Sequence, residues 1–149
     1  MDKKKLLRSL NAHKVKCVII GAVAGVAHGF SRFTRDIDIF IEPTVPNVEK
    51  TLKALEEVGY DISDVTIEEA LSTKLLFRDY ILRTDIHPSV LGVDFDTLWK
   101  NRIQYVFHGE NFFFSSLDDL IKMKKAAGRP QDLEDLRYLE EIKRQKEQG

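Results

Sequence analysis

An apolar strand that runs into a glycine and is followed by two spaced aspartates constrains the fold of this chain more than any other feature. Residues 15–20 are predominantly apolar, as in a buried strand, and Gly21 comes directly after them. The small residues at 22–28 favour a short helix packed closely on a sheet, and residues 36–42 form a second strand-like run. The segment therefore predicts a strand, a tight turn, a short helix and a second strand.

Asp36 and Asp38 stand two positions apart on the second predicted strand, so their side chains point to the same face. At a rise of roughly 3.3 Å per residue their Cα atoms would lie about 6 to 7 Å apart, which lets two carboxylates share one divalent ion or bridge two. Such a pair is more often only the solvated face of an amphipathic strand. The turn at Gly21, whose backbone N–H groups could hold a phosphate, favours a metal and phosphate site instead.

The rest of the chain alternates between helical and strand patterns. Apolar spacing, capping residues and terminal glycines predict helices over 2–12, 48–58, 67–71, 95–99, 117–127 and 130–142. Apolar and aromatic runs predict strands over 74–87, 103–107 and 111–114. This order predicts an α/β (α+β) fold, with a mixed sheet of about four or five strands and a C-terminal helical hairpin.

The composition fits a single domain over residues 1–149. Of the 149 residues, 43% are hydrophobic, and a net charge of −1 provides no overall field for nucleic acid or anionic membrane. The lone Cys17 lies in an apolar run, which excludes an internal disulfide and suits a reducing cytoplasm. No apolar run approaches ~18 residues, so we expect a cytoplasmic protein without a membrane segment.

A metal site of this kind needs a third carboxylate, and Asp85 is the best candidate. It lies in a strand that could run beside the aspartate pair, and it could bind metal or deprotonate an acceptor hydroxyl. His87 shares its face, although a histidine before a proline is more often a solvent-facing turn residue. Asp79 and Asp94 are weaker choices.

Two stretches resemble the nucleotidyltransferase superfamily. The first, IGAVAGVAHGFSRFTRDIDIFI, has an apolar strand, a glycine and, about a dozen residues on, the Asp-x-Asp pair that marks this superfamily. The second, SLDDLIKMKKAAGRPQDLEDLRYL, is similar to the C-terminal segment of minimal nucleotidyltransferases grouped with AbiE-type toxins. The two motifs occur in the expected order, and between them they span most of the chain.

The resemblance implies a polymerase-β-like fold and Mg²⁺-dependent transfer of a nucleoside monophosphate from a nucleoside triphosphate to an acceptor hydroxyl. In that scheme Asp36, Asp38 and Asp85 are catalytic and bind a pair of Mg²⁺ ions. It assigns nucleotide binding to Gly21, Ala22, Arg32, Lys124, Arg129 and Asp132. Asp135 belongs to the same C-terminal motif, which could anchor the last helix against the nucleotide site.

Ala22 departs from the superfamily pattern, which usually has Gly or Ser after the first glycine. Alanine keeps the backbone N–H but brings no hydroxyl to a phosphate. One alternative is therefore a catalytically weak nucleotide-binding or partner-docking module, such as one half of a toxin–antitoxin-like pair. A metal phosphohydrolase or nuclease is another, because it would also use clustered acids.

The acceptor stays open between RNA, a protein hydroxyl and a small molecule, and a cognate antitoxin-like protein is a further candidate partner. Lys122, Lys124, Lys125 and Arg129 form a local basic cluster that would suit a polyanionic acceptor, although a solvated helix face explains Lys122 and Lys125 as readily. His28 precedes Gly29 at the end of a short helix, where a histidine is more often a cap than a catalyst.

Overall fold

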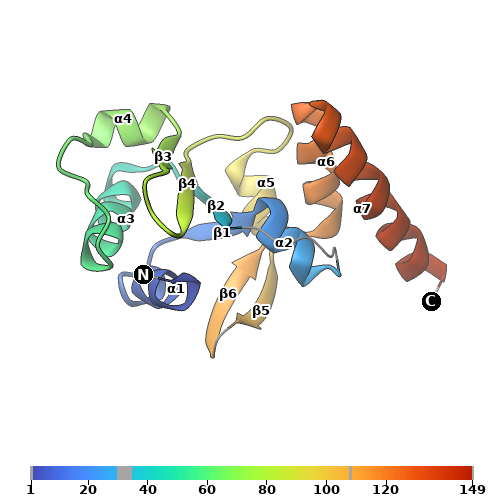
Figure 1. Ribbon diagram of the computed structural model, residues 1–149, viewed down its shortest axis with the longest axis horizontal. Coiled ribbons are helices and arrows are strands. Elements are labelled where there is room, and N and C mark those ends of the chain that lie inside the picture. Colours follow the sequence, from blue (N-terminus) through green and yellow to red (C-terminus); the bar gives the residue numbers. More distant parts are fainter. Residues whose placement is uncertain (1, 30–34, 108, 149) are drawn as a thin grey trace.

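A computed structural model describes residues 2–29, 35–107 and 109–148 of the chain (Figure 1). Its helices are α1 (Lys3–Ala12), α2 (Gly21–Ala27), α3 (Val45–Glu57), α4 (Ile67–Ser72), α5 (Phe95–Lys100), α6 (Leu117–Ala127) and α7 (Pro130–Gln148). Its strands are β1 (Cys17–Ile20), β2 (Asp36–Ile41), β3 (Leu75–Phe77), β4 (Arg83–His87), β5 (Ile103–Phe107) and β6 (Glu110–Phe114). The predicted α/β fold class is confirmed.

The starts of five helices are fixed by local side-chain chemistry. A polar residue precedes each, and its side chain accepts a hydrogen bond from the backbone N–H three residues later, satisfying a group that the helix itself leaves unpaired. The capping residues are Asp2, Thr44, Thr66, Asp94 and Ser116. At the other end of α6, Gly128 adopts a left-handed conformation with φ of 64°, which ends the helix before α7 begins.

The described strands form one mixed sheet of six, in the order β3-β4-β2-β1-β6-β5. The expected number of four or five strands was too low, because the single strand predicted over residues 74–87 is two. Residues 79–82 bend, and the chain returns antiparallel to itself, with Leu75 opposite Ile86. The predicted C-terminal helical hairpin is confirmed, with α6 and α7 packed side by side (Figure 1).

The register at the centre of the sheet brings charged residues from distant parts of the sequence together. β2 pairs antiparallel with β1 and parallel with β4. Asp38 lies opposite Asp85, and Asp36 lies opposite Arg83. In a parallel pair, residues opposite each other point to the same face, so these four side chains share one face of the sheet.

Apolar side chains pack against both faces of the sheet around β2, and on one face Asp36 and Asp38 keep 39% and 27% of their side chains exposed. Ile37 and Ile39 are fully buried on the face opposite Asp38. Tyr60, which follows α3, hydrogen-bonds through its hydroxyl to Thr84 at 2.5 Å on that same buried face. On the aspartate face, Phe95 of α5 packs edge-on against Phe40 at 5.3 Å between ring centroids. The hydrophobic core thus fixes β2 from both sides.

Cys17 is buried in β1, as the sequence predicted, and burial raises the pKa of its thiol to about 12. The thiol is therefore un-ionised at neutral pH, which makes it a packing residue. Among the residues that the structure describes, no helix has the length and apolar character needed to cross a membrane.

Candidate active site

Asp38, Asp85 and His87 form a compact cluster on the aspartate face of the sheet. One ligand atom from each lies within 4.8 Å of the others, and His87 Nε2 lies 2.9 Å from Asp38 Oδ1. The strand register explains this proximity, because Asp85 is opposite Asp38 and His87 is two residues further along β4. Two carboxylates and an imidazole at this separation could hold a divalent cation.

Asp85 is the most buried member of the cluster. Its Oδ2 accepts a hydrogen bond from Arg78 Nη2 at 2.9 Å, whereas its Oδ1 is buried without a hydrogen-bond partner among the described residues. Burial, and then the negative charge of Asp38, raise the pKa of Asp85, while Arg78, Lys74 and His87 act in the opposite direction. A bound cation would stabilise the ionised form of this carboxylate.

Asp36 shares the face of Asp38 but has a different partner. Its carboxylate forms an ion pair with Arg83, with 2.8 Å between Nε and Oδ1. The predicted triad of Asp36, Asp38 and Asp85 is thus brought to one face, although the tight group contains His87 in place of Asp36. The two-residue alternation of Arg83, Asp85 and His87 was the sequence signal for His87.

Gly21 packs directly against the carboxylate of Asp38. It has a φ of +72°, and a Cβ atom added there would lie 2.5 Å from Asp38 Oδ2. Only glycine combines this backbone conformation with so close an approach. Ala22 follows in the first turn of α2 and is partly buried. The turn and the aspartate are therefore neighbours, as the sequence indicated, whereas Arg32 lies outside the described residues.

His28 has a structural role in the fold. It is the C-cap residue of α2, and its buried ring places Nε2 2.7 Å from the carbonyl oxygen of Ser115. Burial lowers the pKa of this histidine, which favours a neutral ring that donates to that carbonyl. The interpretation of His28 as a helix cap is confirmed.

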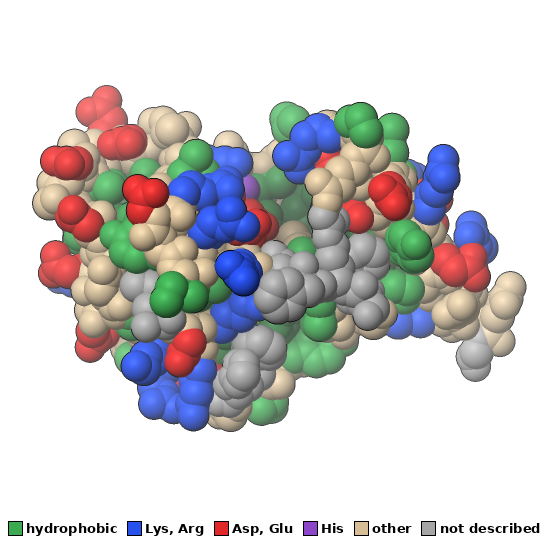
Figure 2. Space-filling view, viewed as in Figure 1, with side chains coloured by type: hydrophobic (Ala, Val, Ile, Leu, Met, Phe, Trp, Pro, Cys, Tyr) green, Lys and Arg blue, Asp and Glu red, His purple; other side chains and the backbone are tan. Residues whose placement is uncertain are grey.

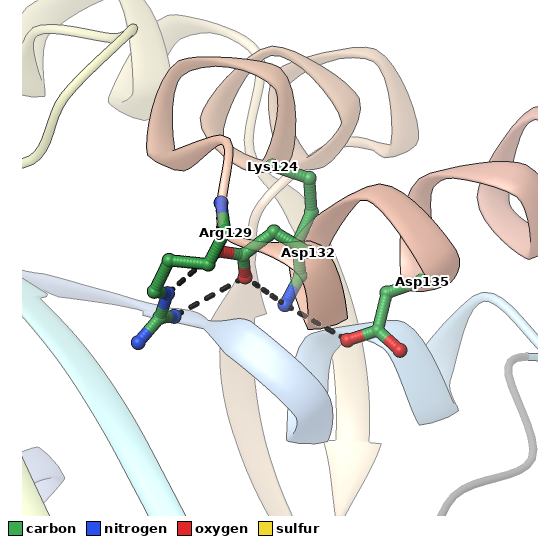
Figure 3. A network of polar contacts seen from close by, with 4 residues as sticks. All are labelled: Lys124, Arg129, Asp132 and Asp135. Atoms are coloured by element: carbon green, nitrogen blue, oxygen red, sulfur yellow. Dashed lines mark hydrogen bonds and ion pairs between the residues drawn. The ribbon is translucent and has the colours of Figure 1, made fainter.

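Lys124, Arg129, Asp132 and Asp135 form a network that joins α6 to α7 (Figure 3). Lys124 Nζ lies 3.4 Å from Asp132 Oδ1 and 3.2 Å from Asp135 Oδ2. Arg129 turns back onto Asp132, donating from its backbone N–H and from its guanidinium, with Nε 2.6 Å from Oδ2. These acids anchor the last helix, and Lys124, with 19% of its side chain exposed, is engaged in holding them.

Arg129 nevertheless keeps 76% of its side chain exposed. The hydrogen bond to Asp132 and the charge of that carboxylate raise the pKa of Arg129, and the charge of Asp38 adds to them. It therefore stands at the α7 side of the site. Figure 2 shows Lys and Arg side chains gathered beside acidic and histidine side chains, at a hollow between the β3–β4 part and the α6–α7 part of the molecule.

A glycine turn against an acidic cluster on a central strand is the arrangement expected for nucleotidyl transfer. The family model for nucleotidyltransferases of unknown function (DUF6036) matches residues 2–144. The chain belongs to this family. Membership confirms the predicted superfamily, whereas the finer grouping with AbiE-type toxins stays a prediction.

The fold of this nucleotidyltransferase is similar to that of a solved relative. The crystal structure of the lincosamide antibiotic adenylyltransferase LnuA, with lincomycin bound, superimposes with a TM-score of 0.62. The two share 17% sequence identity, over 95% of this chain and 98% of LnuA. A comparison with curated proteins found no match. At this identity the likeness supports the nucleotidyltransferase fold and carries no information on the acceptor.

The helix-anchoring network of the nucleotidyltransferase gives a stability prediction. Asp132→Ala is expected to lower the free energy of unfolding by about 3 kcal/mol, because it removes a buried carboxylate from between two cations. Hydrogen bonding from Arg129 holds the pKa of Asp132 below its usual value. The stabilisation that ionised Asp132 provides is therefore fully present above about pH 4, near the pKa of this carboxyl in the unfolded chain. It is lost as the pH falls through the lower pKa of the folded state.

Urea unfolding at pH 7 and pH 3 would measure this effect. The difference between wild type and Asp132→Ala should shrink at the lower pH. The matched control is Asp118→Ala, which also breaks an ion pair between α6 and α7, but at a carboxylate whose side chain is 66% exposed. That change should cost less than about 1 kcal/mol. Equal losses for the two variants would contradict the anchoring role of Asp132.

Proposed function

We propose that this nucleotidyltransferase uses Mg²⁺ to transfer a nucleoside monophosphate from a nucleoside triphosphate to an acceptor hydroxyl. The observation that supports this most strongly is the pairing of Asp38 with Asp85 across β2 and β4, directly beside the Gly21 turn. Family membership supports the transfer chemistry, and the acidic cluster supports the metal.

The residues of the cluster fit a hard divalent cation. Carboxylate oxygens of Asp38 and Asp85 are the donors that Mg²⁺ prefers, and Asp85 Oδ1, which has no hydrogen-bond partner among the described residues, is available to coordinate a cation. Asp36 would join them by exchanging its partner Arg83 for a metal, while His87 Nε2 would suit Mn²⁺ better than Mg²⁺. Bound metal would neutralise charge on the transferred phosphoryl group and on the leaving pyrophosphate.

The side chains around the cluster have separate tasks in this reaction. The acceptor oxygen forms a bond to the α-phosphorus, and the bond from that phosphorus to the bridging oxygen breaks, so that pyrophosphate leaves with the electron pair. Asp85 is placed to take the proton of the hydroxyl through a carboxylate oxygen that does not hold the metal. We assign the triphosphate to the backbone of Gly21 and Ala22, with Arg129 and Arg32 as its side-chain contacts and Lys124 and Asp132 holding Arg129 and α7 in place.

A second candidate is a nucleotide-binding or partner-docking module with weak or no transfer, in a toxin–antitoxin-like pair. Ala22 is the observation that favours it, because its methyl group stands where the superfamily usually has Gly or Ser. The buried, un-ionised thiol of Cys17 is compatible with a cytoplasmic location for either candidate.

A transfer assay separates the two candidates. The protein is incubated with Mg²⁺ and each of the four α-labelled ribonucleoside triphosphates, together with mixed acceptors, while pyrophosphate release and labelled adduct are measured. We expect adduct and pyrophosphate in equal amounts, and loss of both in Asp85→Asn. Labelled nucleotide that binds without adduct, combined with transfer that appears in Ala22→Ser, would instead support the docking module. Pyrophosphate or phosphate release without adduct would indicate a hydrolase.

A further inference from the structure

The outer edge of the sheet beside the carboxylates carries a row of side chains that the proposed chemistry does not use. In the register of β3 and β4, Leu76 lies opposite Asp85 and Leu75 lies opposite Ile86. Leu75 and Phe77 are buried, whereas Leu76 is 53% exposed, so Leu76 points to the face of Asp85. The alternation places Lys74 and Arg78, two residues either side of Leu76, on that face as well.

This edge carries positive charge close to the reacting centre. Arg78 is bonded to Asp85, Arg83 is paired with Asp36, and Lys74 is exposed yet close enough for its charge to act on Asp85. The guanidinium-bearing side chains of Arg78 and Arg83 are 47% and 44% exposed. Both therefore reach an incoming ligand as well as their carboxylates.

We propose that the face of β3 and β4 formed by Lys74, Leu76, Arg78 and Arg83 binds the acceptor, and that the acceptor carries a phosphate group near its reactive hydroxyl. This inference rests on the proposed function for the existence of an acceptor. It adds the chemical class of that acceptor, which the family and the structural likeness leave open.

The position of this face assigns it to the acceptor side. In the strand order, β1 with its Gly21 turn lies on one side of Asp38, and β4 followed by β3 lies on the other. A triphosphate held at Gly21 reaches the carboxylates from the β1 side. The attacking hydroxyl has to approach in line with the leaving group, from the opposite side of the phosphorus, which is the side of Asp85 and Leu76.

The ion pairs explain how these cations become available. A metal bound to Asp36 Oδ1 would release Arg83, whereas Arg78 gives only Nη2 to Asp85 Oδ2 and has further guanidinium N–H groups to offer a second anion. A phosphate is the anion that a guanidinium binds best, through parallel N–H bonds. Leu76, between Lys74 and Arg78, offers an apolar surface to the sugar or base of the same acceptor.

Nearby acids limit the size of the cationic face. A groove of about 410 Å³ on this edge has two cations, Lys74 and Arg78, in its lining. Three acids also line it, so the charge beyond β3 is mixed: Asp61, Glu69 and Asp79. The phosphate is therefore bound close to Asp85, and a long polyanion gains little from the outer groove. A polycationic acceptor, such as an aminoglycoside, would meet three cations beside the reacting centre.

Acceptor competition tests the proposal. With the preferred triphosphate fixed, transfer is compared among a short RNA with a free 3′ hydroxyl, a nucleoside 5′-monophosphate, the same nucleoside without phosphate, and an aminoglycoside. We expect kcat/KM to be at least about tenfold higher for the better phosphate-bearing acceptor than for the nucleoside. Transfer to the RNA but not to the nucleoside 5′-monophosphate would identify a polynucleotide acceptor. Transfer to both would show that a small phosphorylated acceptor is sufficient. A nucleoside or aminoglycoside preferred to both would overturn the proposal.

Lys74→Glu tests the face itself, with Lys53→Glu, an exposed lysine on α3, as the matched control. The change at Lys74 should raise the KM for the acceptor about fivefold and make that KM less dependent on salt concentration. The KM for the triphosphate should be unchanged. Unchanged acceptor KM, or an equal rise for both substrates, would contradict the assignment.

A binding measurement keeps this inference separable from the proposed function. Fluorescence anisotropy with a labelled RNA and a labelled nucleoside monophosphate, in the presence of Mg²⁺, needs no turnover. If no transfer occurs with any acceptor, the proposed function fails. Binding that Lys74→Glu weakens and Lys53→Glu does not would still support a phosphate-binding face, whereas absence of binding to the wild-type protein would refute it.

Discussion

Asp38→Asn is expected to reduce nucleotidyl transfer about 10³-fold while leaving the fold intact. The change removes the negative charge of the carboxylate that lies between the Gly21 turn and Asp85. Loss of metal-ion stabilisation is worth several kcal/mol, and every 1.36 kcal/mol divides the rate by about ten. The asparagine carbonyl can still accept the hydrogen bond from His87, so the unfolding free energy should change little.

Two quantities are measured: transfer of labelled nucleotide, and Mn²⁺ binding as detected by electron paramagnetic resonance. Asp38→Asn should lose both transfer and tight Mn²⁺ binding, while triphosphate bound without metal should be retained. Asp64→Asn, at an exposed carboxylate in the loop after α3, is the control for loss of one negative charge. Transfer that persists in Asp38→Asn would rule out the catalytic assignment of the cluster.

Gly21→Ala is expected to damage both stability and transfer. At a φ of +72° an alanine costs about 1 to 2 kcal/mol in the backbone, and its Cβ would lie 2.5 Å from Asp38 Oδ2. Because His87 holds the other oxygen of that carboxylate, Asp38 cannot move away freely. The total loss of unfolding free energy should reach about 2 to 4 kcal/mol, and a displaced carboxylate should lower transfer about 10²-fold.

Gly109→Ala provides the matched control, because Gly109 also has a positive φ, of +80°, but a Cβ added there would meet no atom of the described residues within 4 Å. It should show the backbone cost without the effect on transfer. Denaturant unfolding and transfer assays of both variants would separate strain from contact. If Gly21→Ala retained full transfer, the close approach to Asp38 would have no catalytic significance.

Much of the site could be predicted because its signals are local. The apolar run ending at Gly21 and the alternation of Asp36 with Asp38 depend only on the period of a strand and on the conformational freedom of glycine. The caps at Ser116 and Gly128 likewise depend on neighbouring residues, so the C-terminal hairpin followed from sequence. The strand over residues 74–87 did not, because its apolar residues run through the bend at 79–82 and hide the reversal of the chain.

Local sequence patterns were enough to predict the order of the elements, the shared face of the two aspartates and the glycine turn that precedes them. Which side chains meet at that face depends on the folded chain. It paired Asp85 with Asp38, placed His87 on the same carboxylate, gave Asp36 to Arg83, and engaged Lys124 with Asp132 and Asp135. The physical reason is that backbone periodicity is set within a few residues, whereas strand register and ion pairing depend on groups brought together across the whole chain.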